Sequence, residues 1–300
     1  MRVISGVPPV LLGAAILLLA ACGDEISSSA GKAKVPDITA TNAFYYYADV
    51  ERAWSFYRDT LGLETVVDYG FAKIMRLAES SYVTLVAAES GMHSVDEPKS
   101  VTLTLVTDHL DAWNARLRSA GAGFLPGIPG RPVDDFVVLD PEGYTLRFQR
   151  SGAFPENVGL TGAIAGLSIR AAIYSIYLTD LDGSGTFYEG LLDIEPVLEA
   201  DRGRLYPISE SGFLELVDGG DELHEATAEN GVTLSFFSTD VDAWFERAAA
   251  WPGFELRTPE VLNEGGLVRV FVGYGPEGYF LEWDTFLEVD ENALLLRYLP

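Results

Sequence analysis

The residues of this sequence with the clearest chemical potential follow a turn that occurs twice. The copies read Asp140-Pro141-Glu142-Gly143-Tyr144 and Gly275-Pro276-Glu277-Gly278-Tyr279. Proline presets φ in a turn, glycine allows a positive φ, and the alternation after the glycine predicts a strand. The fourth residue after that glycine is Arg147 in one copy and Glu282 in the other. A guanidinium can bind a carboxylate or phosphate through two hydrogen bonds, whereas a carboxylate can hold a cation or a proton.

Other residue types that commonly carry catalysis are scarce. The chain has three histidines, His93, His109 and His224, and one cysteine, Cys22. His93 and His224 stand in polar segments and His109 follows a helix cap, so we expect all three to be solvated surface residues. A histidine-based triad would need two distant loops to converge. One cysteine excludes a disulfide within the chain and a cysteine metal cluster.

The first 21 residues are expected to be a lipoprotein signal peptide. Arg2 precedes an apolar run, 10–20, which is short for a membrane-spanning helix. The run ends in Leu19-Ala20-Ala21-Cys22, which resembles the bacterial lipobox and implies cleavage before Cys22 and acylation of its thiol. An ordinary secreted protein with a chance cysteine is the alternative. Gly23, rather than Asp, follows the cysteine. This favours the periplasmic face of the outer membrane over the inner membrane as the location in the bacterial cell envelope.

Composition limits the classes of partner. The length of 300 residues allows about two domains, and the 48% hydrophobic content is ample for packed cores. A net charge of −25 argues against binding to nucleic acid, because nothing basic is concentrated to displace counterions from phosphates. We interpret the acidity as a solubility feature, with a saline habitat as the alternative.

The order of expected elements indicates an internal duplication. Residues 22–40 are predicted to be a flexible tether, and 41–150 contain the order β-α-β-β-β twice. After a linker at 151–170 the same pattern recurs over 171–286, and 287–300 form a tail. Matching landmarks recur, for example Asp111-Ala112-Trp113 and Asp242-Ala243-Trp244. Such self-similarity over a domain length marks a repeat.

These landmarks resemble the vicinal oxygen chelate superfamily, which includes glyoxalase I, bleomycin resistance proteins and extradiol dioxygenases. The motifs that carry the resemblance are Asp49-Val50-Glu51-Arg52, Phe56-Tyr57, Leu61-Gly62-Leu63 and the turn at 140–144, with their repeats. The resemblance implies an α+β fold of two tandem glyoxalase-like domains, 41–150 and 171–286. In each domain a pair of βαβββ units would form a half-open barrel around a cavity.

The resemblance also implies where metal ligands would lie. The family places His, His, Glu and Glu on four strands. These positions correspond to Asn42, Thr84, Thr102 and Arg147 in the first half, and to Ile173, Glu215, Thr233 and Glu282 in the second. No histidine is among them. We therefore expect no catalytic metal and no cofactor, although Glu215 and Glu282 could hold a hard divalent cation weakly in the second domain. The first cavity is expected to be positive and the second negative.

The candidate ligand-binding residues are those expected to face these cavities. Glu215 and Glu282 are predicted on facing strands, where they could share a proton, hold a cation or meet Arg269. Aromatic residues at the same parity could grip a flat ligand, or could simply be core. The full set comprises Phe44, Tyr46, Thr84, Thr102, Arg147, Tyr177, Glu215, Thr233, Arg269 and Glu282.

Three functions remain open from the sequence. The first is a lipid-anchored envelope protein that binds a small organic molecule without a catalytic metal. The second is a divergent metal-dependent lyase or dioxygenase acting in the second domain, and the third is a structural envelope component. The sequence favours a binding protein over an enzyme. It does not indicate the oligomeric state.

Overall fold

The computed structural model describes residues 35–126, 134–153 and 167–300. The predicted signal peptide, Cys22 and most of the tether and linker lie outside these residues. None of the described helices is long and apolar enough to cross a membrane. Residues 35–300 form one compact unit.

The described chain contains four βαβββ units, as predicted. Unit 1 holds β1 (Ala40–Tyr47), α1 (Val50–Ser55) continued by the π-helical turn η1 (Phe56–Thr60), β2 (Glu64–Asp68), β3 (Ala72–Ala78) and β4 (Ser81–Ala87). Unit 2 holds β5 (Val101–Thr107), α2 (Leu110–Ser119), β6 (Gly123–Phe124), β7 (Asp135–Leu139) and β8 (Thr145–Arg150). Short 3-10 turns η2 (Ala88–Ser90) and η3 (Ser151–Ala153) follow β4 and β8.

The second half repeats this order, with one additional strand, β15, in unit 4. Unit 3 holds β9 (Ala171–Leu178), α3 (Leu181–Leu192), β10 (Leu198–Ala200), β11 (Gly203–Pro207) and β12 (Gly212–Asp218). Unit 4 holds β13 (Val232–Phe237), α4 (Val241–Ala249), β14 (Glu255–Leu256), β15 (Leu262–Glu264), β16 (Val268–Tyr274), η4 (Pro276–Gly278) and β17 (Phe280–Phe286). The tail forms η5 (Asp290–Asn292) and α5 (Ala293–Leu296).

Local sequence explains where the helices begin. The Asp49 side chain accepts a hydrogen bond from the backbone N–H of Arg52, and Asp180 does the same for Gly183, at 3.0 and 2.9 Å. An N-terminal cap of this kind satisfies a backbone donor that the helix itself leaves free. The equivalent cap predicted at Asp108 is wrong. Residue His109 precedes α2 without a capping bond, and Asp108 instead bonds Ser151 and Arg170.

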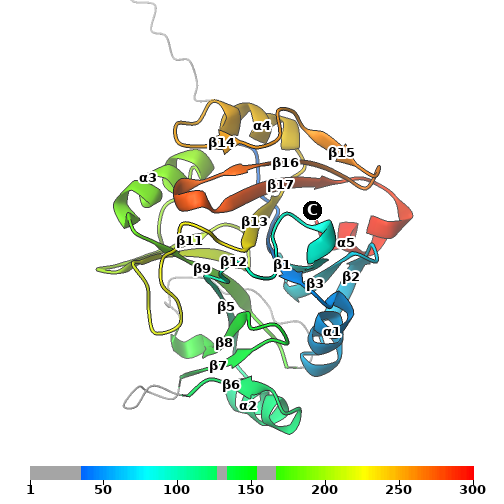
Figure 1. The fold of residues 1–300 in the computed structure, drawn as a ribbon, viewed down its shortest axis with the longest axis vertical. Helices are drawn as coiled ribbons and strands as arrows, with labels where there is room; N and C mark the ends of the chain where they lie inside the picture. The colour runs from blue at the N-terminus through cyan, green and yellow to red at the C-terminus, as the bar shows by residue number, and fades with distance from the viewer. Residues whose placement is uncertain (1–34, 127–133, 154–166) are drawn as a thin grey trace, which may run out of the picture. The chain divides into compact units, whose positions relative to one another are not determined.

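The strands form two open sheets, which confirms the α+β fold class of two paired glyoxalase-like sets of units (Figure 1). Sheet A has the strand order β14-β16-β17-β13-β1-β4-β3-β2, with β15 on β16. Sheet B has the order β10-β11-β12-β9-β5-β8-β7-β6. Sheet A therefore joins units 1 and 4, and sheet B joins units 2 and 3.

This pairing corrects the expectation that consecutive units share a sheet. Strand β1 pairs with β13 of the other half, and β5 pairs with β9. Units 1 and 2 instead meet through the repeated turn, where the Tyr144 hydroxyl accepts a 2.8 Å hydrogen bond from the backbone N–H of Tyr46. Because this contact leaves the edges of β1 and β5 open, each edge is completed by the other half of the chain. The predicted domain boundaries, 41–150 and 171–286, are a separate matter and stay a prediction.

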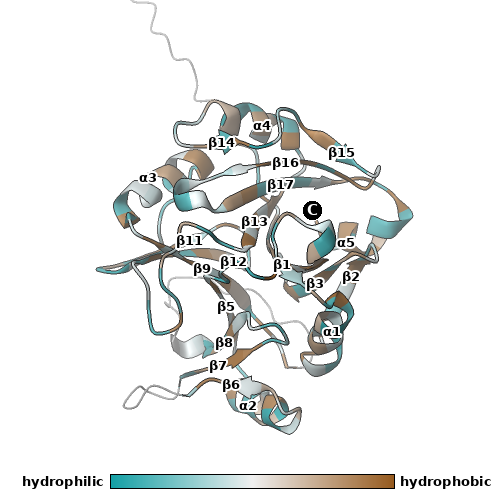
Figure 2. Cartoon of the chain, in the orientation of Figure 1, coloured by the Kyte–Doolittle hydropathy of each residue, from teal (hydrophilic) through white to brown (hydrophobic). Residues whose placement is uncertain are grey.

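One hydrophobic core lies between the sheets. Tyr45 of β1 stacks on Tyr144, and both belong to a large buried cluster that also takes Trp113, Trp244 and Trp283. Hydrophobic residues run through the strands, whereas the outer loops are mostly hydrophilic (Figure 2). Helices α1 to α4 pack on the side of the strands that contributes to this cluster, so the opposite side, called here the inner face, can form a site.

The C-terminal tail packs against the inner side of sheet A. Leu294, Leu295 and Leu299 join a cluster with Tyr82 and Ile74. In Figure 1 sheet A curves around this red segment. The tail therefore closes one end of the inner face.

Candidate functional site

The inner face of sheet A contains a cavity of about 210 Å³, called here the sheet A cavity. Its wall combines side chains from units 1 and 4 with the turn before β3 and the β15–β16 turn. The lining residues are Phe44, Tyr69, Phe71, Ala72, Ile74, Thr84, Glu264, Gly265, Leu267, Val268, Glu282, Asp284 and Phe286. The predicted residues Phe44, Thr84 and Glu282 thus meet in one cavity.

Strand pairing explains why these side chains converge. Asn42 on β1 is paired with Tyr82 of β4 on one side and Ser235 of β13 on the other. Ser235 is paired in turn with Glu282 of β17. Side chains alternate between the two faces of a strand, so residues in register across four strands share the inner face. The cavity needs both halves of the chain.

Glu282 and Asp284, called here the acid pair, dominate the chemistry of this cavity. They lie two residues apart on one face of β17, and Asp284 is 2% exposed. The Ser235 hydroxyl donates a 2.6 Å hydrogen bond to Asp284 Oδ2. Burial raises the pKa of Asp284 to about 7. Burial also raises the pKa of Glu282 well above its usual value, and the nearby charges of Asp284 and Glu264 raise it further. Near neutral pH the pair therefore retains a proton that both carboxyls share.

Asn42 adds an unsatisfied donor beside the acid pair. Its side-chain oxygen accepts a 3.1 Å hydrogen bond from the Thr84 hydroxyl. Its Nδ2 group is buried and has no hydrogen-bond partner among the described residues. Buried polar groups in proteins nearly always have a partner, so an unpaired amide next to a cavity indicates a place for a ligand atom.

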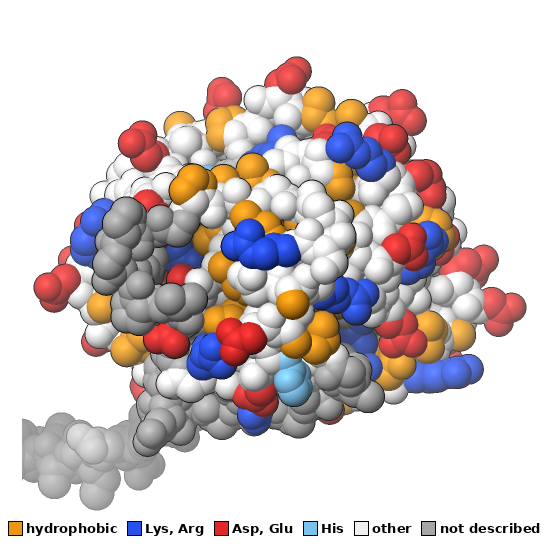
Figure 3. Space-filling model, turned by 90° about the horizontal axis from the view of Figure 1, so that it is seen from below, with side chains coloured by type: hydrophobic (Ala, Val, Ile, Leu, Met, Phe, Trp, Pro, Cys, Tyr) orange, Lys and Arg blue, Asp and Glu red, His pale blue; other side chains and the backbone are white. Residues whose placement is uncertain are grey.

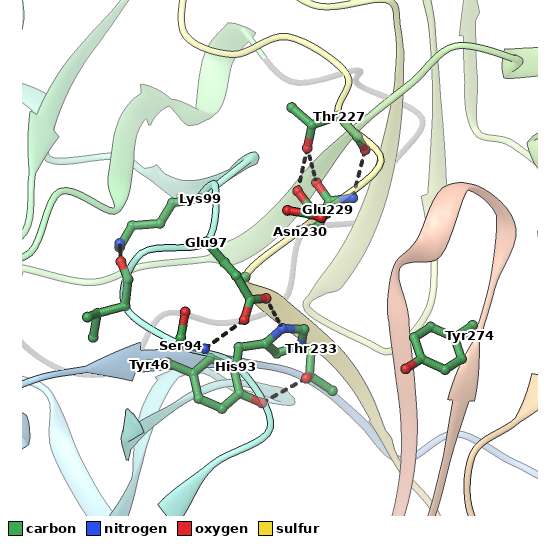
Figure 4. Close-up of polar contacts among 12 residues, drawn as sticks. Tyr46, His93, Ser94, Glu97, Lys99, Thr227, Glu229, Asn230, Thr233 and Tyr274 are labelled. Carbon is green, nitrogen blue, oxygen red and sulfur yellow. Dashed lines mark hydrogen bonds and ion pairs between the residues drawn. The ribbon is translucent and has the colours of Figure 1, made fainter. Parts of the chain in front are cut away.

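A loop after β4 covers the next part of the inner face. His93 packs edge-on against Tyr46 and Phe280, and its Nδ1 is 2.6 Å from a Glu97 oxygen (Figure 4). The Tyr46 hydroxyl is bonded to Thr233 at 2.8 Å. His93 is only 5% exposed, so the prediction of a solvated surface histidine is wrong. Burial lowers the pKa of His93 below its usual value, although Glu97 opposes that shift.

The loop before β13 repeats this arrangement on sheet B. His224 packs against Tyr177 and lies 3.0 Å from the Thr145 hydroxyl, and Tyr177 is bonded to Thr102 at 2.7 Å. Burial lowers the pKa of His224 as well. Its predicted solvation is therefore also wrong. The sequence contained a signal for this arrangement that the prediction did not use. The spacing between His93 and His224 equals the spacing between Tyr46 and Tyr177, as expected for equivalent positions of a repeat.

Arg147 faces acidic residues on the inner face of sheet B. Its guanidinium nitrogens lie 3.6 Å from Asp135, 3.8 Å from Asp221 and 3.6 Å from Glu222. Its side chain is 14% exposed. These carboxylates occupy the surroundings in which an anionic ligand was expected, so internal ion pairs compete with that role.

Each sheet combines predicted site residues from both halves of the chain. Asn42 and Thr84 share sheet A with Thr233 and Glu282, whereas Thr102 and Arg147 share sheet B with Ile173 and Glu215. The expectation of a positive first-half cavity and a negative second-half cavity therefore does not hold, because the four expected positions of each half lie on two different sheets.

Two further expectations, that Glu215 faces Glu282 and that Arg269 meets them, are also wrong. Glu215 on β12 and Glu282 on β17 belong to different sheets, and Glu215 accepts a 2.5 Å hydrogen bond from Ser175. Arg269 meets neither of them. It forms two hydrogen bonds with Asp242 of α4, at 2.5 and 2.7 Å, on the helix side of sheet A. The ion pair expected between Arg269 and the inner carboxylates is replaced by this exposed one.

The donor set on sheet A does not fit the transition metal of the resembled family. Thr233 is engaged by Tyr46, and no imidazole lies at the four ligand positions. Iron, nickel and zinc favour imidazole ligands. Within the described ranges, no group of three or more His, Cys, Asp or Glu side chains is placed to hold a metal ion.

Comparison with known proteins relates this geometry to one superfamily. Residues 39–148 match the Glyoxalase/Bleomycin resistance protein/Dioxygenase superfamily. Curated protein sequences contain no match to the chain.

Solved structures extend the likeness across both halves. Glyoxalase I from Zea mays has a TM-score of 0.60 at 14% identity, over 87% of this chain and 94% of the maize chain. A Bacillus subtilis protein described as a candidate dioxygenase has a TM-score of 0.58 at 15% identity, over 84% of this chain and 86% of that chain. At such low identity these similarities establish the fold alone.

Proposed function

We propose that the protein binds a small organic molecule in the sheet A cavity and that it does so without a catalytic metal. The observation that carries this proposal is the cavity itself, where aromatic side chains and the acid pair meet. An apolar cavity with a few convergent polar groups is the usual form of a small-molecule site. A cavity of about 150 Å³ holds benzene, so about 210 Å³ admits one ring with a short substituent.

Blocking the cavity tests this function. Leu267 lines the cavity and is only partly buried, so Leu267→Trp should fill the space without disturbing the core. The probes are phenethylamine, phenethyl alcohol and hydrocinnamate, which share one ring and differ in charge. We expect at least one of them to bind the wild type in titration calorimetry and to lose at least tenfold in affinity for Leu267→Trp.

The matched control is Leu198→Trp, at a residue 46% exposed on β10 of sheet B. This variant should bind like the wild type. Equal binding by Leu267→Trp, or no binding of any probe to the wild type, would contradict the proposed site.

A metal-dependent lyase or dioxygenase is the alternative, supported by the superfamily domain at 39–148. It requires a stoichiometric metal ion, which elemental analysis of the protein purified at neutral pH would detect. The buried acid pair is a group on this face that could serve acid–base chemistry.

We further propose that Cys22 carries a lipid that holds the protein at the bacterial envelope, on the periplasmic face of the outer membrane. The support is the sequence at 19–22 and the position of the only cysteine. Cys22→Ser should move the protein from the membrane fraction to the soluble periplasm, since stable anchoring depends on the acyl chains. Retention of the variant in the membrane fraction would exclude lipid anchoring at this residue.

A further inference from the structure

We propose that the ligand of the sheet A cavity is a small aromatic amine in its ammonium form. This inference rests on the proposed function and specifies the class of molecule. Three features of the cavity support it: carboxyl groups without a cation, an aromatic wall, and a free buried amide.

The first feature is an uncompensated set of acids. Glu264, Glu282 and Asp284 all line the cavity. Within the described part of the chain, none of the three forms an ion pair with Lys, Arg or His. The charges that act on Glu282 are those of Asp284 and Glu264, both acidic. An ammonium group entering the cavity would supply the missing counter-charge in a poorly solvated place, where such an attraction is strong.

Sheet B gives the contrasting case within the same molecule. There Asp221 and Glu222 lie within 4 Å of Arg147, so the protein supplies its own cation. The equivalent strand position on sheet A is Glu282 rather than arginine. The absence of a protein cation beside Glu282 is therefore particular to the sheet A cavity, not a general property of this acidic chain.

The second feature is the aromatic wall. Phe44, Tyr69, Phe71 and Phe286 line the cavity, and Phe71 is 47% exposed. Aromatic rings pack against a ligand ring and attract a cation over their faces. A simple metal ion or ammonium would leave this apolar surface unfilled, so the cation belongs to a molecule with an apolar body.

The third feature points independently to a ligand. Asn42 is 1% exposed and lies on the same face of β1 as Phe44. Its oxygen accepts a hydrogen bond from Thr84, itself part of the wall, and its Nδ2 has no hydrogen-bond partner among the described residues. This amide can donate to a hydroxyl, ether or carbonyl oxygen, so it would recognise a second polar atom on the amine.

Calorimetric titration at neutral pH with the three probes tests the ligand class. We expect phenethylamine to bind at least tenfold more tightly than phenethyl alcohol, and hydrocinnamate to bind most weakly. Glu282→Gln should weaken phenethylamine about ten- to hundredfold, the value of a hydrogen bond to a charged group, and leave phenethyl alcohol unchanged. Glu215→Gln, which makes the same substitution on β12 of sheet B, is the control and should bind phenethylamine like the wild type.

The outcomes separate this inference from the function on which it rests. Equal or tighter binding of phenethyl alcohol, abolished by Leu267→Trp, would overturn the amine class and leave the cavity function standing. Binding of no probe would overturn both. Asp284→Asn provides a second variant if Glu282→Gln misfolds, and unchanged phenethylamine affinity in a folded variant would also overturn the inference.

Discussion

Asp284 and Glu282 are unusual because Asp284 is buried and Glu282 half-buried, and within the described residues neither forms an ion pair with a cation. Asp284 is held by Ser235, whose strand partner across β13 and β17 is Glu282. Burial disfavours the ionised form of a carboxyl, and a second carboxyl nearby disfavours it further. The folded protein therefore stabilises a protonated state that the unfolded chain would lose at neutral pH.

This shift predicts a pH dependence of stability at the residue scale. Asp284 should ionise near pH 3.9 in the unfolded chain, whereas burial raises its pKa to about 7 in the folded protein. The contribution of this group to the free energy of unfolding is therefore full below about pH 4 and is lost as pH rises through about 7. Asp284→Asn removes this loss, so its stability relative to the wild type should improve by on the order of 4 kcal/mol over that range.

Urea unfolding at several pH values measures the difference between wild type and Asp284→Asn. Glu264 and Tyr69 also face the acid pair, and they are unchanged in both proteins. The difference in unfolding free energy measured at low pH gives the effect of the substitution on the hydrogen bond to Ser235. Subtracting it from the difference at neutral pH leaves the effect of ionisation. A difference that stays constant from acid to neutral pH would show that Asp284 ionises normally in the folded state.

At the scale of elements, the repeated turn is the part that joins one unit to its neighbour. The Glu142 carboxylate accepts hydrogen bonds from the backbone N–H groups of Ala48 and Asp49, each at 3.0 Å, where the chain enters α1. Glu277 accepts from Thr179 and Asp180 before α3 in the same way. Gly143 and Gly278 have φ values of 93° and 80°, which a residue with a side chain rarely adopts.

Removing either glutamate should therefore destabilise the fold. Glu142→Ala and Glu277→Ala leave two backbone donors without their charged acceptor, and each should cost about 1–2 kcal/mol, reduced from the buried value because the bonds are exposed. The two losses should add, since the sites share no partner. Thermal and urea unfolding measure the effect, with the exposed Glu210→Ala as control. Wild-type stability in both variants would contradict a linking role for the turns.

At the scale of the whole molecule, each sheet is shared between the two halves. Strand β1 depends on β13, and β5 depends on β9, so both sheets are completed late in synthesis. The acidic side chains on the face shown in Figure 3 are spread singly around it rather than gathered in one patch. This distribution fits the interpretation of the net charge as a solubility feature.

Shared sheets predict that neither half forms a stable monomer. A fragment of residues 35–153 would expose the open edges of β1 and β5, and such edges pair with other chains. We expect it to dimerise or aggregate alone, and to assemble one-to-one when co-expressed with residues 167–300. Size-exclusion chromatography with light scattering measures the species, and circular dichroism checks folding. A folded monomer of 35–153 would mean that consecutive units can pair after all.

The sequence by itself determined the elements and their order. The Pro-Glu-Gly turns predicted the strands after them, and the repeats predicted four similar units. Each of these signals is local, because turn residues, caps and periodicity act over a few positions. The choice of inner face for Glu282 also followed from strand alternation, and Glu282 does line the cavity.

Only the tertiary structure decided which units share a sheet, and therefore which side chains share a cavity. The edges of β1 and β5 could pair with a strand of either of two units, because backbone hydrogen bonds do not depend on the identity of the side chains. All four units also have the same order of elements. That long-range choice placed Glu282 beside Asn42 and Thr84 rather than beside Glu215. It also buried His93, because the polarity of a loop does not reveal that its histidine packs between Tyr46 and Phe280 of different halves.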